Sequence, residues 1–375
     1  MRLAELHPAF FGPDHHAREE VAASFRSGGS IRERVRDLAA AGLLVSGDVR
    51  TLGVTRWHLA RQDPLNDLAF IIQELGTFPL ARAPGFEAEV REARAGAAVT
   101  VFALTEPDAG SDVKALTTTA VPDGAGYRLN GVKHFISNAP DAHRATVFAR
   151  LDGQIACFLV DDPPAVPQSV AGHSIGRIEL DGTPARLVAP RGLGLAFGAL
   201  ERCRPSVGMA AMGMARRALD ETIRHVRKRV QFGRPLAENP MVQGHVADMA
   251  LEIETATLAA LYACWRRDTA PPQVRTGYSS AIGKVAATEA AQRVIDTAVQ
   301  LHGGVGVEEG SVVQQLYRGI RPLRIYEGTT EIQRVVIASC LAENSSKDKS
   351  LLDDGFVPVV SSVARGADGE VYNVN

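Results

Sequence analysis

A glycine cluster and an isolated carboxylate lie close together near the end of the chain, in the segment 300–334. The glycines of GGVG (303–306) let the backbone approach a flat or phosphorylated ligand closely. Glu327 has an aromatic residue and a glycine as its neighbours, with no cation beside it in the sequence, so it could accept a proton. The segment therefore predicts a site where a carbon acid loses a proton beside a bound cofactor.

Three earlier segments carry groups that suit a planar, phosphorylated ligand. FALTEPDAGSD (102–112) offers hydroxyl and backbone N–H donors to a phosphate or to the edge of a heterocycle. GVKHFISN (131–138) supplies an aromatic ring for one face of such a ligand and a hydroxyl for its edge. RVQFGRPL (229–236) combines a guanidinium, an amide and a phenyl ring. Alone, each also fits a plain turn, a core aromatic residue or cations at a helix C-terminus.

Length and composition limit the classes of protein to which the chain can belong. The 375 residues are enough for two or three domains, and 41 Lys+Arg against 43 Asp+Glu favour neither a nucleic acid nor a membrane surface as partner. The sequence has no run of 18 apolar residues, and its N-terminus lacks the apolar core of a signal peptide. The four cysteines are far apart, which predicts neither a metal site nor a disulfide framework. We expect a soluble protein of a reducing compartment, the cytoplasm.

Apolar periodicity divides the chain into helical and strand-rich parts. Spacings of three and four residues at 31–44 and 65–75 predict a helical N-terminal domain, residues 1–98. Short β-branched and aromatic runs separated by turn residues then predict a middle domain with a small antiparallel sheet, residues 99–194. The expected strands are 99–105, 127–137, 145–150, 154–160, 175–180 and 185–189, with a loop at 161–167.

Long apolar stripes return after the predicted sheet. They cover 207–230, 246–260 and 282–301, and predict a C-terminal four-helix bundle, residues 195–342. The polar tail, residues 343–375, shows no clear periodicity and is expected to be a mobile extension. The predicted fold class is α+β, mainly α.

Five segments together resemble a known family. TEPDAGSD, KHFISNA, RVQFGRPL, QLHGGVG and YRGIRPLRIYEGTTEIQR occur in the order of the signature segments of the acyl-CoA dehydrogenase flavoproteins, and the order of domains is also similar. The resemblance spans roughly residues 30–342. It implies FAD as cofactor, an acyl thioester of CoA or of an acyl carrier protein as substrate, and an electron-transfer flavoprotein as electron acceptor. It also implies a homodimer or homotetramer, because family members share the FAD site between subunits.

The resemblance also implies roles for individual residues. Glu327 matches the base that takes the α-proton while flavin N5 takes the β-hydride; the position of the family's alternative base is Cys203, which excludes that route. The residues matched to substrate contacts are Ser111, Arg204, Tyr326 and Gly328. Those matched to FAD are Phe102, Leu104, Thr105, Gly110, Ser111, Phe135, Ser137, Thr329 and Glu331, with Arg229, Gln231, Phe232, Gln300, Gly303 and Gly304 reaching the ADP half held by a neighbouring subunit.

The chain departs from the family pattern in three places. Asn239-Pro240 replaces an aromatic residue followed by glutamine, and Arg318-Gly319 replaces an arginine–aspartate pair. The segment 181–200 is shorter than usual where the family admits the carrier and the acyl chain. The shortening favours a short, branched or aromatic acyl group, carried on CoA or on a carrier protein. An acyl-thioester oxidase that uses O2 and a noncatalytic flavoprotein of the same fold stay open as alternatives.

Overall fold

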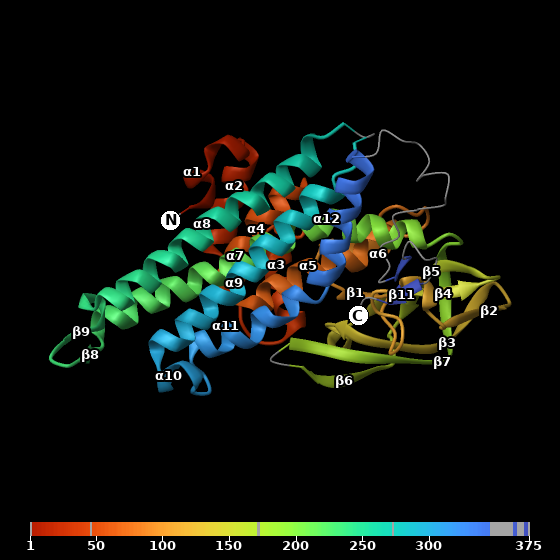
Figure 1. The fold of residues 1–375 in the computed structure, drawn as a ribbon. Coiled ribbons are helices and arrows are strands. Elements are labelled where there is room, and N and C mark those ends of the chain that lie inside the picture. Colours follow the sequence, from red (N-terminus) through yellow and green to blue (C-terminus); the bar gives the residue numbers. More distant parts are fainter. Residues whose placement is uncertain are drawn as a thin grey trace. The chain divides into compact units, whose positions relative to one another are not determined.

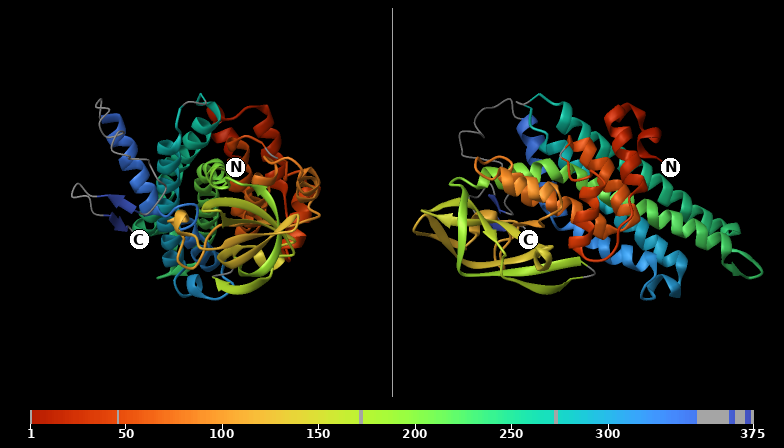
Figure 2. Two further views of the ribbon diagram at one scale, coloured as in Figure 1. Left: turned by 90° about the vertical axis from the view of Figure 1, so that its right-hand side faces the viewer. Right: turned by 180° about the vertical axis from the view of Figure 1, so that it is seen from behind.

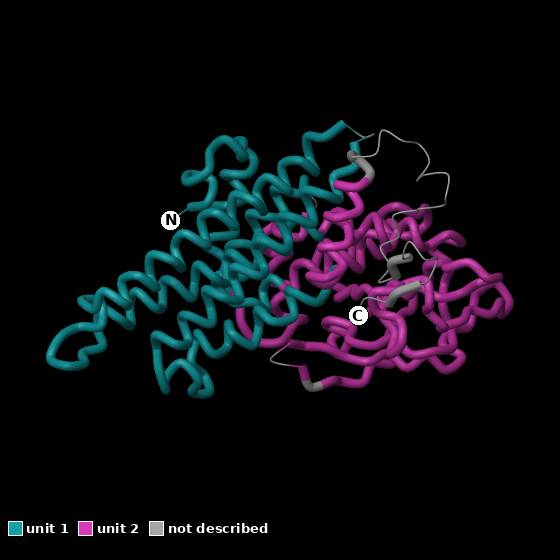
Figure 3. The backbone as a smooth tube through the Cα atoms, viewed as in Figure 1, with its two compact units in different colours: residues 1–26, 47–67, 204–327 teal, residues 27–46, 68–203, 328–375 magenta. Residues whose placement is uncertain are grey.

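The computed structural model describes residues 2–45, 47–170, 173–271 and 274–345, with two further short strands in the tail. They form two compact units (Figure 3): unit 1 is made of 1–26, 47–67 and 204–327, and unit 2 of 27–46, 68–203 and 328–375. Most of the predicted tail, residues 343–375, lies outside the described residues, and its strands β10 (Val363–Arg365) and β11 (Val371–Asn373) pair antiparallel. The α+β, mainly helical fold class is confirmed; the predicted domain boundaries stay a prediction.

Unit 1 is helical (Figure 1). Helix α7 (Leu193–Lys228) begins in unit 2 and continues into unit 1, and a small hairpin of β8 (Val230–Gln231) and β9 (Arg234–Pro235) follows it. The other elements are α1 (Leu3–Leu6), η1 (Pro8–Phe10), α2 (Pro13–Ser24), α4 (Val49–Gln62), η4 (Leu236–Glu238), α8 (Pro240–Thr269), α9 (Gly277–His302), α10 (Gly304–Val307), α11 (Val312–Ile320) and η5 (Arg321–Arg324). None of the helices in the described part of the chain is long and apolar enough to cross a membrane.

Small residues let the helices of unit 1 pack closely. The core on α7 is built from alanine and methionine side chains between 209 and 218, which are buried against α4, α8 and α9. A Cβ added at Gly208 would lie 3.0 Å from the Cβ atoms of Ala260 and Ala287, one on α8 and one on α9. The sequence periodicity therefore located these helices correctly, although each is longer than its apolar stripe.

Gly213 marks the closest contact between α7 and α4. A Cβ at Gly213 would lie 2.1 Å from the backbone oxygen of Trp57, and this oxygen cannot move without moving α4. We expect Gly213→Ala to lower the free energy of unfolding by about 1–3 kcal/mol through overpacking. The matched control is Gly244→Ala on α8, where no described atom lies within 4 Å of the added Cβ; there we expect a gain of roughly 0.4–1 kcal/mol. Urea unfolding of both variants checks the opposite signs, and a neutral Gly213→Ala would contradict the close contact.

Unit 2 contains the sheet and the helices that precede it. The helical elements are α3 (Ile31–Ala40), α5 (Pro64–Leu80, which begins in unit 1), α6 (Glu87–Arg94), η2 (Val113–Ala115), η3 (Ala139–Asp141) and α12 (Thr330–Ser345). Helix α3 begins at the predicted residue because Ser30 and Glu33 form a capping box, in which the Ser30 backbone N–H donates to Glu33 Oε2 at 2.7 Å.

The sheet of unit 2 closes on itself. Its seven strands in the described residues are β1 (Thr100–Ala103), β2 (Thr119–Asp123), β3 (Gly126–Ser137), β4 (Arg144–Leu151), β5 (Gln154–Asp161), β6 (Ala165–Val170) and β7 (His173–Ala189). Strand β5 pairs with both β4 and β7, which completes a ring through β3 and β2 (Figure 2). Most pairs are antiparallel, as predicted, but β1 and β2 each run parallel to β4.

Two strand predictions differ from the structure. The runs 175–180 and 185–189 are parts of one 17-residue strand, β7, because β7 pairs with β3 on both sides of a bulge at 181–182. The predicted loop 161–167 is wrong in its second half, since β6 begins at Ala165 and pairs with β7. Pro167 is tolerated there because β6 lies at an edge, where the missing N–H is not needed.

Candidate active site and cofactor surfaces

The backbone of Glu327 is held in an uncommon conformation in unit 1. Its φ is +54°, in the left-handed region that a glutamate rarely adopts. Arg204 Nε donates to the Glu327 carbonyl oxygen at 2.9 Å, and the N–H of the preceding Tyr326 donates to Pro322 O at 3.0 Å. Such strain persists only where the surroundings determine it, and it is concentrated at functional sites.

The Glu327 carboxylate is buried among cations of unit 1. Burial raises its pKa above the ordinary value for a glutamate, while the positive charges of Arg56, Arg204 and Lys284 act to lower it and Asp67 to raise it. All three cations are themselves buried. A carboxyl group whose pKa is raised toward neutrality, yet kept ionisable by nearby cations, suits a general base.

Of the positive charges that lower the pKa of Glu327, that of Arg56 has the largest effect. The sequence did not single out this residue. Its Nε and Nη2 donate to the two oxygens of Asp67 at 2.7 and 2.9 Å, and Nη1 donates to Ser206 Oγ at 3.0 Å. The sequence signal was weak, because Arg56 is one of several polar residues among the apolar ones at 51–60.

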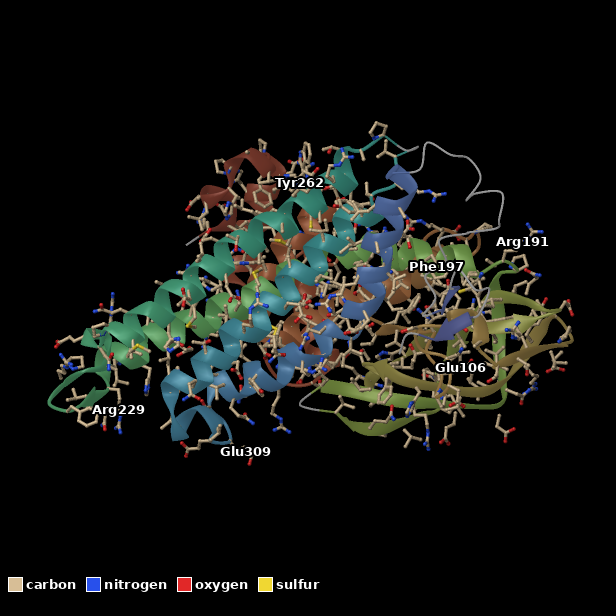
Figure 4. The ribbon with its side chains drawn as sticks, in the orientation of Figure 1. Glu106, Arg191, Phe197, Arg229, Tyr262 and Glu309 are labelled. Carbon is tan, nitrogen blue, oxygen red and sulfur yellow. The ribbon has the colours of Figure 1, made fainter. Side chains whose placement is uncertain are left out.

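A pocket at one end of unit 1 joins two segments that the sequence predicted separately. It encloses about 410 Å³ and is lined by Arg229 after α7, by His302 at the end of α9, and by Glu221, Arg224, His225 and Lys228. The rings of His225 and His302 stack with centroids 4.3 Å apart. Burial lowers the pKa of His225, as do His302 and Arg229. The excess of cations makes this pocket suitable for a phosphate group; Arg229 is labelled in Figure 4.

The hairpin beside Arg229 presents an aromatic ring to its surroundings. Phe232 has a φ of +51° and a relative exposure of 102%, so its ring has no cover within the described chain. Gln231 and Gln300 are also exposed. No described atom would contact a Cβ at Gly303 or Gly304, which leaves an open backbone surface after α9. An exposed aromatic ring, amides and open glycines beside a cationic pocket fit one half of a dinucleotide.

A buried ion pair in unit 2 holds the segment that follows β1. Lys133 Nζ donates to Glu106 Oε1 at 2.7 Å and to Leu104 O at 3.2 Å, and the Glu106 carboxylate also accepts the N–H groups of Thr117 and Thr118. Burial acts to raise the pKa of Glu106, but the Lys133 charge and these hydrogen bonds outweigh it and lower the pKa to about 2. Burial lowers the pKa of Lys133 to about 8.

The predicted flavin residues of unit 2 lie on β1, on β3 and on the segment after β1. The His134 N–H donates to Thr105 O at 2.9 Å, which ties this segment to β3. The next residue, Phe135, has a φ of +54° and an exposure of 56%, and its N–H donates to Gln168 Oε1 at 3.1 Å. Of the other predicted residues, Leu104 is buried, Gly110 is exposed, and Phe102, Ser111 and Ser137 are partly buried.

The last predicted residues begin α12. Gly328 has a φ of +91°, and Thr329 Oγ1 accepts the Ile332 N–H at 3.3 Å, which caps the helix. Glu331 is exposed in the first turn. The structure therefore brings Glu327, Arg204 and Tyr326 together in unit 1 and joins the segments after β1 and within β3 in unit 2.

Two departures from the family pattern have local explanations. Asn239 caps α8 by accepting the Met241 N–H at 2.9 Å, and Pro240 occupies the first helical position, where its missing N–H costs nothing. Gly319 is buried, and a Cβ there would lie 3.2 Å from Met214 Cε. An aspartate at 319 would bury a charge beside this methionine, which is unfavourable without a partner, so the glycine suits the packing of this chain.

Comparisons with known proteins agree with these observations. Models of the middle and C-terminal domains of acyl-CoA dehydrogenases match residues 101–186 and 190–342. Cyclohexane-1-carbonyl-CoA dehydrogenase of Geobacter metallireducens is 34% identical over 309 residues, 75% of this chain and 78% of the relative. The human mitochondrial short-chain specific acyl-CoA dehydrogenase is 34% identical over 266 residues, 66% of this chain and 63% of the relative. The structure of butyryl-CoA dehydrogenase from Megasphaera elsdenii is similar with a TM-score of 0.79 at 25% identity, covering 88% of this chain and 99% of that one.

Proposed function

The chain belongs to the acyl-CoA dehydrogenase family, and from that premise we propose that it removes two hydrogens from an acyl thioester with Glu327 as the base and FAD as the cofactor. As a member of this family it is an oxidoreductase that acts on CH–CH bonds. The observation that carries the assignment of the base is the geometry of Glu327: a half-buried residue with a buried Oε2 atom, held in a left-handed conformation in which its carbonyl oxygen accepts from the buried Arg204.

In the proposed reaction Glu327 takes the proton from the α-carbon of the thioester. FAD, when bound, would accept the hydride from the β-carbon. The α-hydrogen would leave as a proton and the β-hydrogen as a hydride, and the electron pair left on the α-carbon would form the carbon–carbon double bond. Arg204 holds the Glu327 backbone through its carbonyl oxygen and so orients the carboxylate. Burial keeps water from competing for the proton and raises the basicity of the carboxylate.

We assign the surfaces described above to the two halves of FAD. Phe135, Ser137 and the segment Phe102–Ser111, including Leu104, Thr105 and Gly110, would hold the flavin, and Thr329 and Glu331 would complete that pocket. Arg229, Gln231, Phe232, Gln300, Gly303 and Gly304 would bind the ADP half of an FAD held by a second copy of the chain. The exposed ring of Phe232 supports this, because a homodimer or a homotetramer would cover it.

The acyl group proposed for this enzyme is short, branched, aromatic or otherwise cyclic. The shortened segment 181–200 supports this proposal, since only three residues separate the end of β7 at Ala189 from the start of α7 at Leu193. Relatives named for cyclohexane-1-carbonyl-CoA and for short-chain acyl-CoA point in the same direction. We propose CoA or an acyl carrier protein as the carrier, and an electron-transfer flavoprotein as the electron acceptor.

A titration of the purified holoprotein with acyl thioesters tests the proposal. We expect a yellow protein whose flavin absorbance bleaches without oxygen when short or cyclic acyl thioesters are added, on CoA or on carrier protein. A preference for long straight-chain acyl-CoA would contradict the substrate class. A colourless protein that takes up no FAD would contradict the enzyme assignment. Rapid reoxidation by air with release of peroxide would instead identify an oxidase.

A further inference from the structure

Two histidines of unit 1 meet where α7 and α9 end, in the pocket that contains Arg229. His225 lies in the last turn of α7, and His302 is the last residue of α9. Their rings stack, with centroids 4.3 Å apart and an angle of 27° between the planes. Both line the pocket, at the end of unit 1 where Figure 4 labels Arg229. Because histidine is the side chain whose charge changes most readily near neutral pH, this pocket can change its charge.

The permanent charges of the pocket leave two cations for a ligand. Glu221, the carboxylate among the lining residues, accepts from Arg224 Nη1 and, at 2.7 Å, from Arg217 Nε. Lys228 and Arg229 form no ion pair with any residue that the structure describes, and both are exposed. An anion in the pocket would therefore meet two cations whose charges no carboxylate offsets.

A hydrogen bond of His302 determines how its ring can act. Nδ1 lies 2.7 Å from the carbonyl oxygen of Ala298, which can only accept, so Nδ1 carries a hydrogen in both charge states of the ring. Nε2 then has a lone pair in the neutral ring and an N–H group only in the protonated ring. His302 can therefore donate to a further oxygen through Nε2 only after it has gained a proton.

Positive charge on the histidine pair is unfavourable as long as no anion is bound. Burial lowers the pKa of His225, and the charges of His302 and Arg229 lower it further. Two protonated rings would hold like charges 4.3 Å apart. The C-terminal ends of the two helices favour cations, which brings the protonated state within reach. A phosphate group beside the rings would offset the repulsion, because its oxygens are negative and accept hydrogen bonds from N–H groups.

A metal ion fits the same pocket less well. Two arginines already occupy the Glu221 carboxylate, and the unpaired cations at 228 and 229 would repel a metal ion. Within the described part of the chain, no three histidine, cysteine or acidic side chains are placed to hold a metal. The chemistry of the lining residues thus favours an anion.

We propose that His225 and His302 are binding residues of this pocket: it takes a phosphate or diphosphate group, and the histidine pair takes up a proton when that group binds. The inference rests on the assignment of the ADP half of FAD to this region. It goes further because it adds His225, His302 and Lys228 to the binding residues and makes binding of the phosphate dependent on pH. A fall in pH would strengthen binding, since the proton and the anion enter together.

The test measures binding of two phosphate compounds to the full chain. FAD is the first, because its diphosphate does not titrate near neutral pH, and inorganic pyrophosphate is the second. Isothermal titration calorimetry in buffers with different heats of ionisation gives both the affinity and the number of protons taken up. The variant His225→Asn/His302→Asn removes both titrating rings, while the amide introduced at 302 can still donate to Ala298 O. The matched control is His245→Asn, at an exposed histidine of α8 in the same unit.

For the wild type we expect uptake of about one proton per FAD and an affinity that weakens roughly tenfold as the pH rises from about 6 to about 8. The double variant should take up no proton, and its affinity should stay constant over this range. His245→Asn should behave as the wild type. Pyrophosphate titrates in the same range, so its result is the difference between the wild type and the double variant. Lost packing alone would weaken binding without changing the number of protons.

Equal proton uptake in the wild type and in His225→Asn/His302→Asn would overturn the inference and leave FAD as the cofactor. Binding of pyrophosphate but not of FAD, with proton uptake that the double variant loses, would support the proton-linked site and contradict the assignment of FAD. If neither compound bound at any pH, the pocket would not be an anion site and the inference would be wrong.

Discussion

Glu327→Gln is expected to slow reduction of the flavin by an acyl thioester by about 10²–10⁴-fold, the loss typical of a removed general base. The variant should stay folded and yellow and should still bind the thioester, because glutamine keeps the shape of the side chain and removes only its basicity. Stopped-flow absorbance under anaerobic conditions measures the rate of bleaching directly. Binding is followed separately, by the shift of the flavin spectrum when the thioester is added.

A second glutamate serves as the control for this variant. Glu254→Gln changes an exposed carboxylate on α8, in the same unit, and should leave the rate unchanged. If Glu327→Gln reduced its flavin at nearly the wild-type rate, the base would have to be another residue. Loss of bound FAD from Glu327→Gln would instead indicate that the residue supports the structure of the site.

Glu106→Gln is expected to lower the free energy of unfolding by about 3–5 kcal/mol, because it leaves Lys133 buried without its carboxylate partner. Both side chains are almost completely buried, so solvent does not screen the loss. Urea unfolding at neutral pH measures the effect. Glu179→Gln is the matched control, since its ion pair with Arg177 lies on the exposed surface of the same sheet and should change stability by less than about 1 kcal/mol.

The same ion pair predicts how stability depends on pH. The pKa of Glu106 is about 2 in the folded protein and 4.5 for an unperturbed glutamate. Its contribution is therefore fully present above about pH 4.5 and is lost as the pH falls from 4.5 to 2. Stability curves of the wild type and Glu106→Gln should converge in this window. Parallel curves through the same range would show that the carboxylate is not ionised in the folded protein.

The sequence was a good guide to the fold where periodicity was strong. The stripes at 246–260 and 282–301 lie within α8 and α9, and the predicted start of the helix at Ile31 is correct because Ser30 and Glu33 cap it. It could not show that β5 pairs with both β4 and β7, because the closure of a sheet depends on contacts between distant strands. For the same reason residues 165–167 were assigned to the loop 161–167, and only the pairing with β7 makes them the start of a strand, β6.

Part of the candidate site could likewise be predicted from the sequence, and part could not. The motif around Glu327 was visible because glycine and aromatic neighbours mark it in the sequence. Its strained backbone, and that of Phe135 and Phe232, could not be predicted, because φ is set by tertiary contacts. Arg56 and Asp67 were missed for another reason. A charged residue in a helix of mixed polarity gives no information about its partner until the fold brings α4, α5 and α7 together.

The closed sheet of unit 2 has a consequence for self-association. Closure uses both edges of β5. Among the strands of this sheet it leaves one free side on β1, on β6 and on most of β2, because β2 pairs with β4 only at Thr119. Strand β1 has only four residues, and β2 and β6 carry Pro122 and Pro167, which cannot donate a backbone hydrogen bond. These free edges are therefore poor templates for a strand from another molecule. We conclude that the closed sheet is protected against edge-to-edge aggregation, so that copies of the chain would associate through helical surfaces and exposed aromatic residues rather than through this sheet.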